Sequence, residues 1–111
     1  MTIDSIRGLA RRWLQDTVEP YRWSDEALKR YIGLAVRELN SRVPSTRYVG
    51  GAVTDGTPIP LTDADALALD DRYEEAVTCY ATYLAYRDDS PDTANEQLAA
   101  TYLARSKELM Y

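Results

Sequence analysis

The stretch from Val43 to Leu69 constrains this chain most, because here the helical spacing of apolar residues gives way to Tyr, Val, Thr, Gly and Pro. Such residues are typical of a hairpin or an extended arm, and the stretch is about a quarter of the 111 residues. A two-stranded hairpin is only marginally stable in water unless something covers its apolar face. We therefore expect an arm over residues 43–69 that a partner surface covers.

Two helices are predicted before this arm. Apolar residues recur every three or four positions from Ile3 to Leu14, with Thr2 as the N-cap. Ser24 opens a second helix that runs from about Asp25 to Arg42 and ends before a proline. The polar residues expected to face away from the core on these two helices are Arg7, Arg11, Arg12, Lys29, Arg30, Arg37 and Asn40.

Two further helices are predicted after the arm. Asp71 and Glu74 have the spacing of a capping box at the start of the third helix. This helix is apolar or aromatic around almost its whole circumference, so we expect it at the centre of a bundle or against another subunit. Ser90 and Pro91 open a fourth helix that reaches about Met110. Its expected inner stripe is Leu98, Ala99, Tyr102, Leu103 and Leu109.

The predicted fold class is therefore mainly α. We expect a small four-helix bundle, made of two helical pairs, with a long hairpin-like or extended arm inserted between helices two and three. Residues 1–111 are expected to form a single domain, because no repeat or linker interrupts the pattern.

The arm itself allows two interpretations. Residues 47–49 and 52–54 have strand character, and Asp55-Gly56 suits the turn of a hairpin. Pro58 and Pro60 each remove a donor from a strand ladder, which favours an edge strand or an irregular arm. Gly50-Gly51 lacks the Lys and Ser/Thr of a phosphate-binding loop, so we interpret it as a bend.

Composition excludes several kinds of chemistry. With no His and only Cys79, the chain has no ligand set for zinc, no Ser-His-Asp triad and no Cys-His pair. Thirteen basic and eighteen acidic residues give a net charge of −5, which opposes general binding to nucleic-acid phosphates. Asp63, Asp65, Asp70 and Asp71 lack the glycine and closing Glu of a calcium loop. We predict no cofactor, no metal site and no catalytic residues, and without a signal peptide or membrane span we expect synthesis in the cytoplasm.

One acidic group keeps an enzyme in view as the alternative. Glu74, Glu75, Asp89 and Asp92 resemble the magnesium ligands of small all-α nucleoside-triphosphate pyrophosphohydrolases, which carry a double-Glu motif and a Glu-x-x-Asp motif on successive helices. Here the second motif is only Asp-x-x-Asp, and it straddles a predicted helix start. We favour the interpretation that the glutamates are first-turn residues stabilised by the helix dipole.

Aromatic usage indicates interfaces. Nine Tyr, two Trp and no Phe suit surfaces that are partly wet and partly buried. Trp13, Tyr31 and Tyr80 fall on helical stripes and are expected in the core. The candidate interface residues are Tyr48, Val49, Val53, Ile59, Leu61, Tyr83, Tyr86 and Tyr111.

Three sequence features together resemble a known family. Trp23-Ser24-Asp25-Glu26 followed by Leu28 opens the second helix, Pro58 to Leu61 reads Pro-Ile-Pro-Leu, and Tyr73 to Val77 precedes Arg87-Asp88-Asp89. In this order they resemble the head-to-tail adaptor proteins of tailed bacteriophages, also called connector or head-completion proteins. The similarity extends over nearly the whole chain. Several members of that family carry a longer C-terminal tail that reaches into the portal, whereas this sequence ends at Tyr111.

The resemblance implies a structural virion protein at the head-tail junction. Such adaptors are small helical bundles that form a homo-oligomeric ring, commonly of twelve copies, with the portal protein above and a tail or second connector protein below. DNA passes through the lumen without specific binding, no membrane is involved, and no catalytic residues are implied. A lumen that lets DNA slide is expected to carry carboxylates. The candidates are Asp63, Asp65, Asp70 and Asp88.

Overall fold

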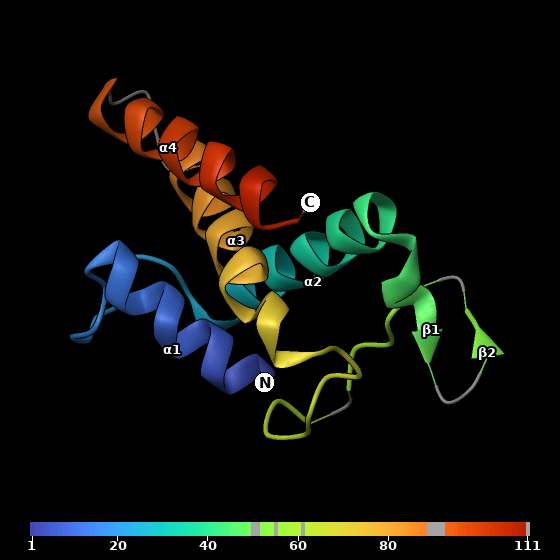
Figure 1. Ribbon diagram of the computed structural model, residues 1–111. Helices are drawn as coiled ribbons and strands as arrows, with labels where there is room; N and C mark the ends of the chain where they lie inside the picture. The colour runs from blue at the N-terminus through green and yellow to red at the C-terminus, as the bar shows by residue number, and fades with distance from the viewer. Residues whose placement is uncertain (50–51, 55, 61, 89–92, 111) are drawn as a thin grey trace.

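The computed structural model describes residues 1–49, 52–54, 56–60, 62–88 and 93–110. Its four α-helices confirm the predicted mainly α fold, a small four-helix arrangement with the arm between the second and third helices. The helices are α1 (Ile3–Leu14), α2 (Asp25–Arg42), α3 (Glu74–Asp88) and α4 (Thr93–Leu109) (Figure 1). The shorter elements are η1 (Pro44–Arg47), β1 (Tyr48–Val49), β2 (Ala52–Val53) and η2 (Asp71–Tyr73).

Side-chain caps set where the first two helices begin, as predicted. The Thr2 hydroxyl accepts the Ser5 amide at 3.0 Å, and the Ser5 hydroxyl accepts the Thr2 amide at 2.9 Å, which completes a reciprocal capping box. Ser24 accepts the amide of Ala27 at 3.1 Å at the start of α2. Both helices therefore begin at the predicted residues.

The predicted start of the third helix is wrong by a few residues. Asp70, not Asp71, is the N-cap; it accepts the amide of Arg72 at 3.0 Å and opens the 3₁₀ turn η2, which leads into α3 at Glu74. The Asp71 carboxylate instead lies 2.6 Å from the amino group of Met1. Because that contact joins residues at the two ends of a long stretch of chain, local capping patterns gave no sign of it.

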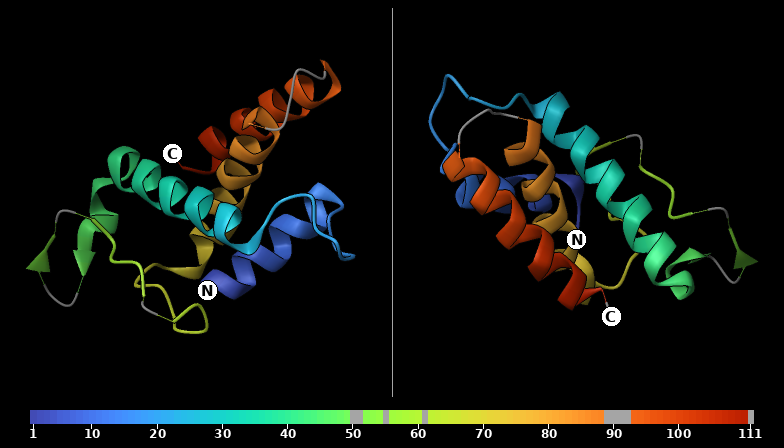
Figure 2. Two further views of the ribbon diagram at one scale, coloured as in Figure 1. Left: turned by 180° about the vertical axis from the view of Figure 1, so that it is seen from behind. Right: turned by 90° about the horizontal axis from the view of Figure 1, so that it is seen from above.

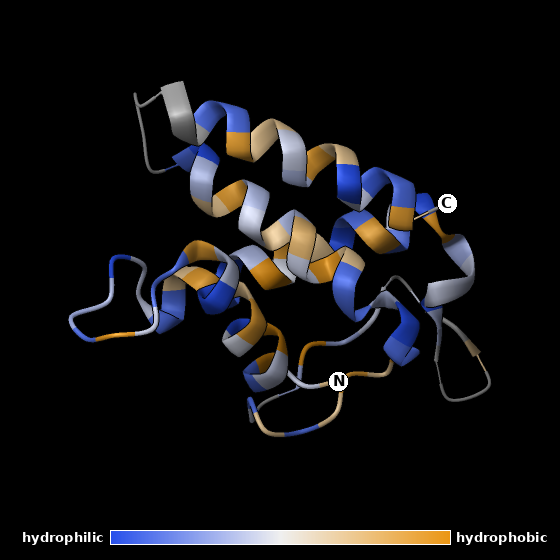
Figure 3. Ribbon diagram, turned by 60° about the vertical axis from the view of Figure 1, so that its left-hand side comes forward, coloured by the Kyte–Doolittle hydropathy of each residue, from blue (hydrophilic) through white to orange (hydrophobic). Residues whose placement is uncertain are grey.

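The central helix is α3, as its all-round apolar sequence predicts. It packs against α1, α2 and α4, and it lies beside α4 in every view (Figure 2). Its buried residues are Ala76, Val77, Thr78, Cys79, Ala81, Thr82, Leu84, Ala85 and Tyr86. Hydrophobic segments gather where the helices cross, and hydrophilic segments lie along the outer faces (Figure 3). None of the described helices has the length and apolar content needed to cross a membrane.

A ladder of four aromatic rings fills the space between α1, α3 and α4. Trp13 stacks on Tyr102 with ring centroids 5.7 Å apart, and Tyr102 stacks on Tyr86 at 5.9 Å. Trp23 then meets Tyr86 edge-on at 6.0 Å. Two predictions are corrected here: Tyr86 is only 8% exposed and belongs to the core rather than to an open surface, and Leu98 on α4 is 40% exposed rather than on the inner stripe.

The hairpin turn does not lie at Asp55-Gly56. Tyr48 pairs with Val53 and Val49 with Ala52, so the chain reverses between Val49 and Ala52, where the sequence has its Gly-Gly pair. Residues 56–60 form no strand, which agrees with their two prolines. Residues 50, 51 and 55 lie outside the described part of the chain.

Part of the arm is covered by the chain's own helices, and cover by a partner surface stays a prediction for the rest of it. Leu67 is buried beside α1 and donates its backbone amide to the Met1 carbonyl at 3.0 Å. Thr2 and Ala66 form an isolated antiparallel bridge. The second half of the arm is therefore a strap across the start of α1, and the projecting part is the hairpin (Figure 1).

Candidate functional site

Asn40 fixes the root of the arm to α2. Its side-chain oxygen accepts the hydroxyl of Thr46 at 2.7 Å and that of Thr57 at 3.0 Å, and its backbone carbonyl accepts Nε of Arg47 at 3.2 Å. Asn40 is only 5% exposed, so the prediction that it faces away from the core is wrong. The sequence did carry a sign of this burial: Asn40 comes four residues after Val36, so both residues lie on one face of the helix.

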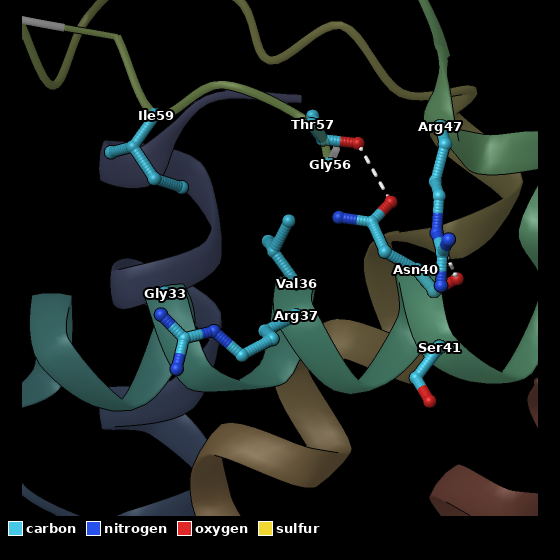
Figure 4. A pocket seen from close by; sticks show the side chains of 9 residues that line it. All are labelled: Gly33, Val36, Arg37, Asn40, Ser41, Arg47, Gly56, Thr57 and Ile59. Carbon is cyan, nitrogen blue, oxygen red and sulfur yellow. Dashed lines mark hydrogen bonds between the residues drawn. The ribbon is translucent and has the colours of Figure 1, made fainter. Parts of the chain in front are cut away.

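A groove of about 370 Å³ lies between α2 and the first half of the arm. Its lining is Gly33, Val36, Arg37, Asn40, Ser41, Arg47, Gly56, Thr57 and Ile59 (Figure 4). Two of these residues are arginines and none is acidic, although the chain as a whole is acidic. Among the described pockets, this groove is the one whose described lining has two cations, an apolar wall and no acidic residue.

Of the candidate interface residues on the arm, Tyr48 and Ile59 present exposed side chains. Tyr48 is 61% exposed on β1 and borders a second hollow, of about 240 Å³, between the hairpin and residues 68–73. Ile59 lines the groove beside α2. Val49 and Val53 lie in the two strands, but their side chains are outside the description, as are residues 61 and 111.

A second surface lies across α2 and α3. Tyr83 is half-buried and meets Tyr80 edge-on with ring centroids 5.3 Å apart, while the Arg87 guanidinium lies 5.6 Å from the Tyr83 ring. A hollow of about 280 Å³ opens here, lined by Leu34, Arg37, Glu38, Tyr80, Leu84 and Arg87. Tyr83 thus stays a predicted contact residue, in contrast to Tyr86 on the inner side of the same helix.

A buried ion pair holds the connection between α1 and α2. Arg11 lies 3.0 Å from the Asp16 carboxylate and 2.6 Å from that of Asp25, and it also donates to the Trp23 carbonyl at 3.0 Å. Arg11 is 7% exposed, so the prediction that it faces away from the core is wrong. A guanidinium is tolerated there because three acceptors satisfy it.

Asp63 does not stand free as a lumen charge. It lies 2.9 Å from Arg7 and 2.6 Å from Lys29, and the hydrogen bonds from Lys29 and Arg7 lower its pKa below the usual aspartate value. The other three lumen candidates, Asp65, Asp70 and Asp88, are exposed. These three remain predicted contributors to a negative lumen.

Of the four acidic residues in the alternative enzyme interpretation, the structure describes Glu74 and Glu75, which are neighbours in the first turn of α3. Glu75 lies 3.3 Å from Arg105, and Glu74 accepts the Ser5 hydroxyl at 3.3 Å. Asp89 and Asp92 lie outside the described residues. Within the residues that are described, no group of three or more His, Cys, Asp or Glu side chains could hold a metal ion.

Comparison with models of known protein families gives no match for this chain, and no curated protein or solved structure matches it either. A proposal for its function therefore rests on the surfaces described above together with the sequence resemblance to the adaptor proteins.

Proposed function

We propose that this chain is a structural adaptor of a tailed-phage virion. In this proposal it forms a ring, of twelve copies as in the proteins it resembles, between the portal protein and a tail or second connector protein. The ring completes the head and provides the platform on which the tail docks around the DNA exit channel.

The observation that carries the proposal is an exposed hairpin on a rigid root. Asn40 binds both Thr46 and Thr57, so the chain on either side of the hairpin is fixed to α2, while Tyr48 at its base is 61% exposed. A large aromatic side chain that is open to solvent on an anchored segment of backbone suits protein contacts, because little backbone entropy is lost when it binds. The sequence resemblance places such an arm between helices two and three.

The overall charge agrees with a DNA channel that does not bind its cargo. A net charge of −5 gives a repulsive field toward phosphate. The exposed carboxylates Asp65, Asp70 and Asp88 can contribute to that field in an assembled ring. A ring structure whose lumen is lined mainly by Arg and Lys would contradict this part of the proposal.

The direct test measures binding to assembled portal protein by light scattering, for the native chain and for Tyr48→Ser. The native chain should add mass to the portal as a ring, and Tyr48→Ser should bind at least about tenfold more weakly. Leu98→Ser is the matched control, because Leu98 is 40% exposed on α4, away from the arm. It should bind the portal like the native chain, and both variants should keep the native helical circular-dichroism signal.

Two results would overturn the adaptor assignment. One is a native chain that adds no mass to portal rings. The other is magnesium-dependent nucleotide hydrolysis that Glu75→Gln abolishes while particle assembly survives, which would favour the pyrophosphohydrolase alternative.

A further inference from the structure

The loop between α1 and α2 is a fixed protrusion. The buried Asp16 carboxylate accepts the backbone amides of Arg22 at 2.8 Å and Trp23 at 3.0 Å, and it pairs with Arg11 at 3.0 Å. One side chain therefore ties the two ends of the loop together. The tip, residues 17–21, is exposed, and the loop projects beyond the end of α1 (Figure 2).

The tip combines an apolar side chain with a carboxylate. Val18 is 78% exposed, more than any other large hydrophobic residue in the described part of the chain. Glu19 beside it is exposed and makes no ion pair with the described residues. Exposing a valine on a preorganised loop has no benefit for folding of the single chain, since burial of apolar surface is what stabilises it.

The groove beside α2 has the complementary chemistry. The Asn40 oxygen is occupied by two hydroxyls, which turns its amide nitrogen toward the groove (Figure 4). Arg37 is exposed and makes no ion pair or hydrogen bond within the described part of the chain, and Arg47 uses only Nε on the Asn40 carbonyl. Val36 and Ile59 supply apolar wall. Among its described lining residues, the groove therefore offers hydrogen-bond donors and no acidic acceptor, next to a small hydrophobic surface.

We propose that this groove receives the loop tip of a second copy of the chain. The Glu19 carboxylate of one copy binds Arg37 and Arg47 of the next, and Val18 packs against Ile59. Charge complementarity selects this occupant, because the same acidic chain presents both an unpaired carboxylate beside an exposed valine and a cationic groove with an apolar wall.

The positions of the two features determine the kind of assembly. The loop leads into the start of α2, whereas the groove is lined by the second half of α2, from Gly33 to Ser41, and the hairpin follows the far end of this helix (Figures 1 and 2). The loop of a chain therefore cannot reach its own groove. A contact between unlike surfaces of identical copies is heterologous, and it closes into a ring when the rotation permits. This inference rests on the proposed adaptor function and identifies one contact of its ring.

The contact is small, so a single one should be weak. A five-residue tip buries far less than the roughly 1,200 Å² of a stable pairwise interface. In a closed ring each copy makes the contact twice, once with its loop and once with its groove, which raises the effective concentration. Self-association should therefore appear at high protein concentration and low salt.

The test is sedimentation equilibrium of the full chain between about 10 μM and about 1 mM. The native chain should exceed its monomer mass of 12.6 kDa as concentration rises. Arg37→Glu and Glu19→Lys should each weaken association at least about tenfold, because each places like charges together. The double variant, which exchanges the two charges, should restore it. Val18→Ser, which keeps the charge, should weaken association to a smaller degree.

Lys107→Glu is the matched control, since it makes the same charge reversal on exposed α4, outside every described hollow. A native chain that stays monomeric at the highest concentration would overturn the contact, as would single variants that associate normally or a double variant that does not recover. Particles completed normally by Arg37→Glu would overturn the contact and leave the adaptor function standing. If the double variant recovers self-association but the native chain binds no portal, the contact would stand and the adaptor function would be overturned.

Discussion

Asp16 has a buried side chain to which several hydrogen-bond donors point. Its carboxylate is buried and accepts two backbone amides and the Arg11 guanidinium. These donors are buried or partly buried, so an apolar residue in place of Asp16 would leave the two amides without an acceptor and would remove one of the three acceptors of Arg11. The loop geometry and the charge of Arg11 thus depend on one residue.

Asp16→Asn should lower the free energy of unfolding by about 3 kcal/mol. The amide keeps the shape but removes the charge that compensates Arg11, and its NH₂ group would face N–H donors. Urea unfolding followed by circular dichroism measures the loss. Glu19→Gln, on the exposed tip of the same loop, is the control and should change stability by less than about 0.5 kcal/mol. Equal stability of both variants would show that Asp16 does not hold the loop.

The buried tyrosines make stability sensitive to alkaline pH. Burial raises the pKa of Tyr86 and of Tyr102 above the ordinary value near 10, with smaller contributions from neighbouring groups. The folded state therefore holds these protons more tightly than the unfolded state. The resulting stabilisation is complete below pH 10 and is lost as pH rises through the folded-state pKa.

Tyr86→Phe should weaken this alkaline dependence. We expect the native free energy of unfolding to be level up to about pH 10 and then to fall by at most about 1.4 kcal/mol per pH unit for each tyrosine. Removing one hydroxyl should make the decline shallower, at the cost of a long hydrogen bond of 3.4 Å to the Trp13 carbonyl. Urea midpoints at successive pH values provide the measurement. An unchanged slope in Tyr86→Phe would refute the assignment.

At the level of whole elements, the arm is two segments with different anchors. Its first half is attached to the end of α2 through Asn40, and its second half is attached to the start of α1 through Leu67. Loss of one anchor should therefore loosen one half and leave the other in place.

Asn40→Ala should raise hydrogen exchange in residues 46–57 while exchange in residues 62–69 stays native. The variant removes the shared acceptor of the Thr46 and Thr57 hydroxyls, which should cost about 1 kcal/mol because each hydroxyl keeps a backbone carbonyl as acceptor. Mass spectrometry of peptic peptides resolves the two halves. The control is Gln97→Ala, at an exposed position on α4. Uniform loosening of both halves would show that the arm is one cooperative unit.

Local chemistry explains which elements were predictable. Thr2 and Ser24 bond to amides three residues away, so their sequence positions were enough to place two helix starts. The burial of Arg11 depends partly on Asp25, fourteen residues away, and that of Asn40 on Thr57, seventeen residues away. Helical periodicity assigns polar residues to the outer face, and only a tertiary partner reverses that assignment.

The candidate surfaces were predictable to a smaller degree. The tyrosine and valine content of the arm indicated a contact segment, and Tyr48 is exposed there. The groove could not be predicted, because it forms only when the arm folds back on α2, and Tyr86 was misplaced because its partners Trp23 and Tyr102 lie on other parts of the chain.

For the molecule as a whole, ion pairs join segments that lie far apart in the sequence. Arg7 lies 2.6 Å from Asp4, 3.6 Å from Asp25 and 2.9 Å from Asp63, and so connects α1, the start of α2 and the arm. Lys29 on α2 adds a second contact to Asp63 at 2.6 Å. The arrangement of these three segments should therefore depend on the ionisation of carboxylates.

Acid should loosen this arrangement in a defined direction. Hydrogen bonds from Lys29 and Arg7 lower the pKa of Asp63, and the hydrogen bond from Arg11 lowers that of Asp25, so the unfolded chain binds more protons than the folded one. The free energy of unfolding should fall as pH drops from about 4 through these lowered values. Both carboxylates are partly exposed, so salt should weaken the effect.

Asp63→Asn should flatten the acid limb, because it removes one of the titrating groups together with its charge. Urea unfolding between about pH 5 and pH 2 measures the slope, and Asp65→Asn, whose exposed carboxylate has no ion pair within the described residues, should keep the native slope. If Asp63 instead faced a lumen as an unpaired charge, its removal would relieve repulsion and leave the acid limb unchanged. The slope therefore distinguishes an internal anchor of the arm from a channel carboxylate.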